Sequence, residues 1–174
     1  MTRGKIRVVD CGAGDRLSGL ALRREAATNG ALAYIAGNDI SPRMLDIAKD
    51  RGCYDEIKLV DMNEKPLPYN DNSFDFVTCI GTITYINPES GLLDEFVRIT
   101  RPGGIVAYTN RTDKLDKWKK SELELERQGN WLYEQKIGPI PYLPQNKEYG
   151  RDIEVVILIY RVLMKSGGQH IIPD

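Results

Sequence analysis

Metal-binding side chains are scarce in this sequence. Its 174 residues include one histidine, His170, and three cysteines, Cys11, Cys53 and Cys79, which lack the spacing of a CxxC motif. Structural and catalytic zinc sites are usually built from closely spaced Cys and His, so we expect no metal site. An odd number of scattered cysteines is typical of reduced thiols in or near a core, which predicts a cytoplasmic protein.

The chain also lacks a charge excess and long hydrophobic runs. Its 24 basic and 25 acidic residues give a net charge of −1. Without a clustered positive surface, binding to extended nucleic acid is not expected. The longest apolar run, residues 155–160, is far below the roughly 20 residues of a membrane span. The first ten residues hold no apolar core of a secretory signal. We therefore expect no membrane association.

The order of apolar segments predicts an α/β fold. Strands are expected over residues 5–10, 33–38, 57–60, 74–80, 105–109, 131–137 and 153–163, and helices over residues 17–29, 42–51, 92–100 and 114–128. Alternating strands and helices indicate a seven-stranded, mostly parallel sheet with helices on both faces. The last two strands are joined without a helix, which predicts that the last strand is antiparallel. One domain is expected over residues 1–165, followed by a flexible Gly-rich tail over 166–174.

Two tryptophans and one charged helix are expected to be structural. Trp118 and Trp131 are interpreted as core or helix–sheet packing residues. In the segment 114–127, charges of both signs alternate, which favours a solvent-exposed helix face, with Leu115, Trp118 and Leu125 on the opposite side.

Three short segments carry the functional signal. The turn Asp10-Cys11-Gly12-Ala13-Gly14 follows the first strand, and its glycines let the backbone approach a ligand closely; alternatively, it is only a tight strand-to-helix turn. Asp39 ends the second strand and can accept hydrogen bonds from ribose hydroxyls, or cap the next helix. Asp61, near the end of the third strand, can accept from an adenine amino group, or lie in a solvated turn.

Taken in order, four motifs resemble those of class I S-adenosylmethionine (SAM)-dependent methyltransferases. They are DCGAG, NDISPRMLDIAK, DMNEKPLPYNDNSFDFVTC and RITRPGGIVAYTNR. More closely, TRPGGIVAYTNRT, the charged helix after it and the final IYRVL are similar to the Williams–Beuren syndrome region methyltransferase-like proteins. The resemblance implies a Rossmann-like methyltransferase fold with SAM as cofactor and S-adenosylhomocysteine as product.

The resemblance also implies roles for individual residues. Asp10, Gly12, Ala13 and Gly14 would line the methionine end of SAM. Asp39 would bind the ribose, with Ile40 beside the adenine, and Asp61 and Met62 would bind the adenine from its other side. Ile80 and Gly81 would lie along the cofactor near the sulfonium.

The sequence departs from the family pattern in two ways. A third glycine is replaced by Arg16, which either forms a surface pair with Asp15 or reaches the methionine carboxylate. The chain also begins almost at the first strand, without the preceding helices that close over SAM in the family. We therefore expect an open site, or one completed by a homodimer or a partner chain.

The acceptor is expected to bind in loops at the same edge of the sheet. The loops 81–87, 110–113 and 138–150 offer Thr82, Tyr85, Asn110, Arg111 and Tyr142 as candidate substrate residues. No residue is an obvious catalytic base, and the acceptor is a small molecule or a protein side chain.

Two other functions are weighed against methyl transfer. A dinucleotide oxidoreductase would need a third glycine of GxGxxG where Leu17 stands. A non-catalytic SAM-binding or scaffold subunit is favoured by the missing helices.

Overall fold

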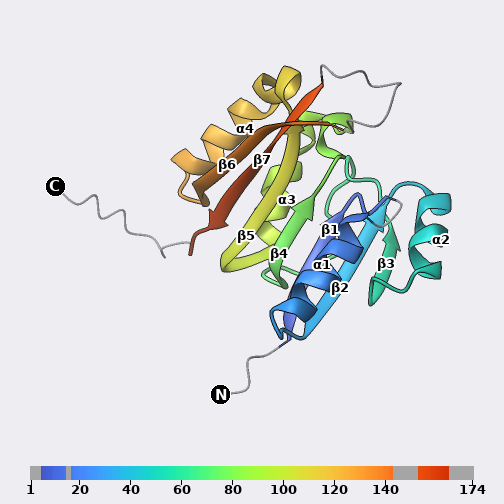
Figure 1. The fold of residues 1–174 in the computed structure, drawn as a ribbon. Helices are drawn as coiled ribbons and strands as arrows, with labels where there is room; N and C mark the ends of the chain where they lie inside the picture. The colour runs from blue at the N-terminus through green and yellow to red at the C-terminus, as the bar shows by residue number, and fades with distance from the viewer. Residues whose placement is uncertain (1–4, 15–16, 143–152, 165–174) are drawn as a thin grey trace.

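The chain forms one seven-stranded sheet with helices on both sides (Figure 1). The computed structural model describes residues 5–14, 17–142 and 153–164. Asp15, Arg16, His170 and the predicted tail 166–174 lie outside the described residues, so the predictions made for them stay untested.

Element bounds follow the predicted order closely. The strands are β1 Ile6–Cys11, β2 Ala33–Asp39, β3 Glu56–Leu59, β4 Phe74–Cys79, β5 Thr100–Arg111, β6 Trp131–Pro141 and β7 Glu154–Val162. The helices are α1 Leu17–Thr28, α2 Pro42–Asp50, α3 Leu92–Ile99 and α4 Leu115–Arg127, and three short 3₁₀ turns are η1 Ile83–Tyr85, η2 Pro88–Ser90 and η3 Thr112–Lys114.

The strand order is β3-β2-β1-β4-β5-β7-β6. Strands β1 to β5 are mutually parallel, and β7 runs antiparallel to both β5 and β6. The predicted fold class, including the antiparallel last strand, is confirmed. Strands β1 to β5 end at one edge of the sheet, called the carboxyl edge below.

Two strands are longer than predicted, and both carry irregularities. β5 begins at Thr100, whereas the strand was expected to begin at residue 105. A Cβ added at Gly104 would lie 2.7 Å from the Asp75 carbonyl oxygen, which shows how closely the two backbones approach there. β6 continues through Pro141, with a register shift between Ile137 and Ile140. Proline has no N–H to donate within a sheet, so it is tolerated mainly at bulges and in edge strands, and β6 is an edge strand.

One face of the sheet is packed against α3 and α4 (Figure 1). Trp118 and Trp131 are both fully buried in this core, as predicted, and the Trp131 ring stacks on Tyr160 at a centroid distance of 4.0 Å. The three cysteines are free and buried.

The charged helix α4 corrects one prediction. The charge pattern of residues 114–127 predicts that Glu122 is solvent-exposed, yet it is only 4% exposed. It follows Trp118 by four residues, so it shares the buried face of the helix. The Tyr108 hydroxyl donates to its Oε1 at 2.6 Å, which satisfies part of the buried carboxyl.

The opposite face is covered only in part. Helix α1 lies over β1 and β2, whereas β4, β5, β7 and β6 have no helix in front of them among the described residues (Figure 1). Large apolar side chains are consequently exposed on these strands or beside them: Phe76, Ile80, Leu132, Ile137 and Ile140.

Candidate cofactor and acceptor site

The carboxyl edge brings together the ends of β1, β2 and β4. Cys11 is in register with Asn38, and Asp10 with Thr78, so the glycine turn, Asp39 and Gly81 all leave the sheet at this edge. Ligands of open α/β sheets bind outside the carboxyl ends of the strands, near the point where the strand order reverses. Here that point lies between β1 and β4.

The turn after β1 depends on its glycines. Gly12 and Gly14 have φ values of +80° and +51°, a region that side chains disfavour. The N–H groups of Gly12 and Ala13 both donate to the Asn38 carbonyl oxygen, at 2.9 and 2.7 Å. A Cβ at Gly12 would lie 2.3 Å from Thr82 Oγ1. The turn is therefore folded onto β2 on one side and Thr82 on the other.

Asp39 joins this turn to the start of α2. Its Oδ2 accepts from the Gly14 N–H at 2.9 Å, and its Oδ1 accepts from the Ser41 N–H at 2.9 Å. Ser41 caps α2 by accepting from the Met44 N–H. Each carboxylate oxygen can accept a further hydrogen bond, so Asp39 can still receive two hydroxyl donors.

Asp10 is enclosed instead of facing the edge. It is fully buried and accepts hydrogen bonds from the hydroxyls of Ser18, Tyr54 (2.7 Å) and Thr78 (3.0 Å). Burial raises the pKa of this carboxyl, while the three hydroxyl donors oppose the rise. Within this structure Asp10 ties β1 to α1, β4 and the segment after α2; its predicted contact with SAM stays a prediction.

The residues predicted for adenine differ in exposure. Asp61 follows β3 and is half-buried; its Oδ1 accepts from the backbone and side-chain nitrogens of Asn63, which lowers its pKa. Ile40 is exposed, so it can flank a ring. Met62 is buried in the core, so an adenine ring could contact its side chain only through an opening in the loop that follows β3. All three assignments stay predictions.

Ile80 and Gly81 lie at the end of β4. Ile80 is exposed, and the Gly81 N–H donates to Thr109 Oγ1 at 2.7 Å, which fixes the backbone after β4 to β5. A Cβ at Gly81 would lie 3.5 Å from the Tyr142 hydroxyl oxygen, so Tyr142 approaches the predicted sulfonium position.

The other acceptor candidates are spread over the same edge. Thr82 Oγ1 lies 3.3 Å from the Gly12 carbonyl oxygen, Tyr85 is exposed, and Arg111 forms a bidentate pair with Asp113 at 2.9 Å. Asn110 is fully buried, and neither the nitrogen nor the oxygen of its side-chain amide has a hydrogen-bond partner among the described residues. A water or ligand is therefore needed to satisfy Asn110.

The sequence did not indicate the structural roles of two residues, Tyr54 and Asn38. Tyr54 packs so closely that a Cβ at Gly19 would lie 2.4 Å from its ring, and one at Gly37 would lie 3.0 Å away. Asn38 donates to the Tyr69 hydroxyl at 3.1 Å. A glycine inside a strand indicates close approach of another group, so Gly37 was the signal that could have revealed Tyr54.

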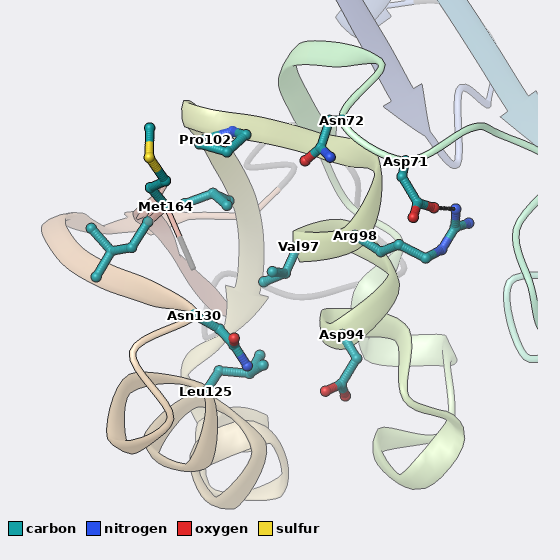
Figure 2. Close-up of a pocket in the computed structure, with 11 residues that line it drawn as sticks. Asp71, Asn72, Asp94, Val97, Arg98, Pro102, Leu125, Asn130 and Met164 are labelled. Carbon is teal, nitrogen blue, oxygen red and sulfur yellow. Dashed lines mark hydrogen bonds and ion pairs between the residues drawn. The ribbon is translucent and has the colours of Figure 1, made fainter. Parts of the chain in front are cut away.

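A separate hollow lies at the opposite edge (Figure 2). Its volume is about 440 Å³, and Asp71, Arg98, Pro102, Asn130 and Met164 line part of it. Asp71 precedes β4 and Met164 follows the antiparallel β7, so this hollow is at the amino ends of the parallel strands. It is therefore not the place where the predicted cofactor residues meet.

The described parts of the chain offer neither a metal-binding cluster nor a membrane-spanning helix. No group of three or more His, Cys, Asp or Glu side chains there is placed to hold a metal ion. No helix there has the length and apolarity required to span a membrane.

Comparison with known proteins identifies the family. Residues 9–108, more than half of the chain, match the family described as "Methyltransferase domain". The chain belongs to this methyltransferase family. Human methyltransferase-like protein 27 is 33% identical to the domain over 100 residues, covering 55% of this chain and 40% of that protein. Demethylmenaquinone methyltransferase of Bacillus licheniformis is 37% identical over 99 residues, covering 56% and 40%.

Solved structures match the methyltransferase domain as a fold. A SAM-dependent methyltransferase from Mesorhizobium loti superposes with a TM-score of 0.65 and 17% identity, covering 91% of both chains. These findings confirm the predicted class I SAM-dependent methyltransferase fold. The domain spans less than half the length of the two relatives named above.

Proposed function

We propose that the methyltransferase domain binds SAM at the carboxyl edge and transfers its methyl group to a small-molecule or protein acceptor. The observation that carries the proposal is the hydrogen bond from the Gly14 N–H to the Asp39 carboxylate. It fixes the glycine turn and the acidic strand end side by side, where an adenosyl group would span them. A small-molecule acceptor is supported by the match to demethylmenaquinone methyltransferases.

The residues at this edge suit such a ligand. Asp39 retains acceptor capacity for two ribose hydroxyls. Among the described residues no hydrogen bond reaches Asp61 Oδ2, which leaves that oxygen for an adenine amino group. Among the described residues, a Cβ at Gly14 would meet only the Gly12 carbonyl oxygen, at 3.9 Å, which leaves space above the turn. Ile40 and Ile80 add exposed apolar surface beside it.

The protein's part in the reaction is mainly to orient the reactants. A bound sulfonium supplies an activated methyl group whose leaving group is a neutral thioether. The acceptor must then be held in line with that methyl, with water excluded. Thr82 and Tyr142, which lie against Gly12 and Gly81, are the residues we assign to this task. No residue is assigned as a general base, which is needed only if the acceptor must lose a proton.

A second candidate is a SAM-binding chain whose site is completed by another polypeptide, either a second copy or a partner. The exposed apolar side chains on β4 and β6, including Phe76 and Ile137, favour it. Sedimentation of the isolated chain, followed by methyl-transfer assays on the monomeric fraction, separates the two candidates. Turnover by a monomer would exclude the second. We further propose a cytoplasmic location, because Cys11, Cys53 and Cys79 are free thiols.

The binding test uses calorimetry with S-adenosylhomocysteine. Asp39→Ala should weaken binding by at least about tenfold, the worth of one charge-assisted hydrogen bond. Asp46→Ala is the matched control, because Asp46 is an exposed carboxylate of α2 that pairs with Lys49. It should leave the affinity unchanged. Equal affinity of folded Asp39→Ala and wild type would contradict the ribose assignment.

A further inference from the structure

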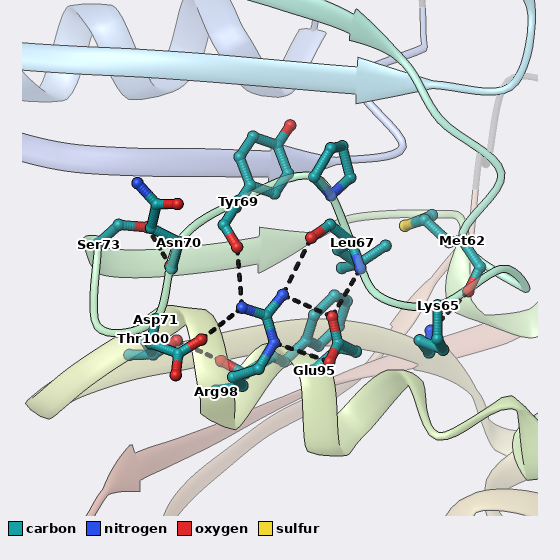
Figure 3. Close-up of polar contacts among 12 residues, drawn as sticks. Met62, Lys65, Leu67, Tyr69, Asn70, Asp71, Ser73, Glu95, Arg98 and Thr100 are labelled. Atoms are coloured by element: carbon teal, nitrogen blue, oxygen red, sulfur yellow. Dashed lines mark hydrogen bonds and ion pairs between the residues drawn. The ribbon is translucent and has the colours of Figure 1, made fainter.

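Helix α3 is bonded to the loop that follows β3. This loop, residues 60–73, contains near its start Asp61 and Met62, the two residues assigned to adenine. Figure 3 shows the Arg98 guanidinium between α3 and the loop, with dashed contacts to Leu67, Tyr69 and Asp71.

Arg98 and Glu95 together hold the peptide groups of Leu67. Arg98 Nη2 donates to the Leu67 carbonyl oxygen at 3.0 Å, and the Leu67 N–H donates to Glu95 Oε2 at 2.7 Å. Arg98 Nη1 donates to the Tyr69 carbonyl oxygen at 2.8 Å and to Asp71 Oδ1 at 2.7 Å. The two side chains also pair with each other at 2.7 and 2.8 Å.

The pair is partly shielded from water, which strengthens it. The side chains of Arg98 and Glu95 are 26% and 13% exposed. Hydrogen bonding to Arg98 lowers the pKa of Glu95, so the pair is charged at neutral pH. Planar guanidinium groups suit this task because they donate in several fixed directions at once.

The Asp61 end of the loop is held by short-range contacts and by two longer ones, from the Val60 N–H to the Asp39 carbonyl oxygen at 3.0 Å and from the Asn87 N–H to Asn63 Oδ1 at 2.9 Å. Strand β3 has only four residues and is the outermost strand on its side of the sheet, so it gives the loop little support. Asp61 is bonded to Asn63, and the Lys65 ammonium donates to the Met62 carbonyl oxygen at 2.9 Å. Leu67 is the next buried residue along the loop, and its peptide is the point that α3 fixes.

We propose that Arg98, together with Glu95, is a positioning residue that fixes residues 60–71 so that the Asp61 carboxylate meets the adenine amino group. This inference rests on the proposed function, since it concerns the same cofactor site. Arg98 does not touch the cofactor. It acts by restricting the loop, so its loss should reduce recognition of the amino group more than binding of the rest of the nucleoside.

The test measures discrimination as well as affinity. Dissociation constants are measured by calorimetry for S-adenosylhomocysteine and S-inosylhomocysteine, in which an oxygen replaces the adenine amino group. Wild type should prefer the adenosyl compound by about tenfold, the value of one charge-assisted hydrogen bond. In Arg98→Ala the preference should fall to less than about threefold, close to that of Asp61→Ala. General destabilisation of the protein would weaken the binding of both compounds equally and leave the ratio of their dissociation constants unchanged.

Arg127→Ala is the matched control. Arg127 makes the same (i, i+3) pair with Glu124, at 3.0 and 2.7 Å, but it lies on α4 and contacts no other segment among the described residues. Its variant should keep the wild-type ratio. If Arg98→Ala does not fold, Arg98→Lys replaces it; lysine can keep one carbonyl contact but not all of them, so an intermediate ratio is expected.

The outcomes separate the two proposals. A wild type that does not bind S-adenosylhomocysteine overturns the proposed function itself. A wild type that binds and discriminates, beside a folded Arg98 variant with the same ratio, overturns only the positioning role. Equal binding of both compounds by wild type also overturns the positioning role, because Asp61 would then not recognise the adenine amino group.

Discussion

The two glycines of the turn after β1 differ in how much space surrounds them. Gly12 and Gly14 are equivalent in the sequence motif, and both have positive φ values. Their described surroundings differ: a Cβ at Gly12 would collide with Thr82, whereas a Cβ at Gly14 would lie 3.9 Å from the nearest atom of the described residues. The same substitution should therefore have unequal costs at the two positions.

We predict that Gly12→Ala is the more destabilising change. Gly14→Ala should cost about 1–2 kcal/mol, from backbone strain alone. Gly12→Ala should cost about 2–5 kcal/mol, because overpacking adds to that strain. Urea denaturation measures both values. Thr82→Gly in the Gly12→Ala background should recover the steric part, and equal costs for the two alanine variants would argue against the Thr82 contact.

Helix α4 buries one acidic side chain, that of Glu122. Its Glu122 lies one turn after Trp118, and the Trp131 indole N–H donates to the Glu122 carbonyl oxygen at 3.2 Å. The helix is therefore held to β5 and β6 through one acidic residue and its aromatic neighbours. Burial raises the pKa of Glu122 above its ordinary value of 4.5.

We predict a pH-dependent effect of Glu122→Gln. The folded protein keeps the Glu122 proton at pH values where the unfolded chain has lost it, so the wild-type free energy of unfolding falls as pH rises above 4.5. Glutamine cannot ionise. The variant should therefore gain stability relative to wild type as the pH is raised from 4 to 8, measured by urea denaturation at each pH.

Glu124→Gln provides a control of opposite sign. Arg127 lowers the pKa of Glu124 to about 2, so this carboxylate stabilises the folded state above pH 4.5 and loses that effect as pH falls. The Glu124 variant should therefore lose stability relative to wild type as pH rises. The same pH trend in both variants would contradict the burial of Glu122.

The whole molecule should respond to cofactor binding as one cooperative unit. The sheet is continuous, and the core residues of β1, β4, β5 and β7 belong to one cluster. A ligand that binds only the folded state raises stability by about 2.7 kcal/mol at 100 times its dissociation constant. For a chain of this size, that raises the melting temperature by about 5–10 °C.

We predict such a shift with S-adenosylhomocysteine and none with NAD. Thermal unfolding followed by fluorescence or calorimetry measures it, and the Asp39→Ala variant should show a smaller shift at the same ligand concentration. A response to NAD alone would favour the oxidoreductase hypothesis, which the sequence opposes by placing Leu17 where the dinucleotide motif needs glycine.

The sequence by itself determined the order of the strands and helices, the glycine turn and the acidic strand ends. These features are local: hydrophobic period, turn residues and helix caps act over a few neighbouring positions. Asp39 could therefore be placed at the end of β2 from sequence alone, and Trp118 in the core from its spacing with Leu125.

Only the tertiary structure decided which distant groups meet. Tyr54 and Asp10 are 44 positions apart, and Arg98 reaches Leu67 across 31. The burial of Glu122 likewise depends on Tyr108 from another strand. No periodicity encodes such pairs, because contacts between remote segments form only when the sheet assembles and desolvates them together.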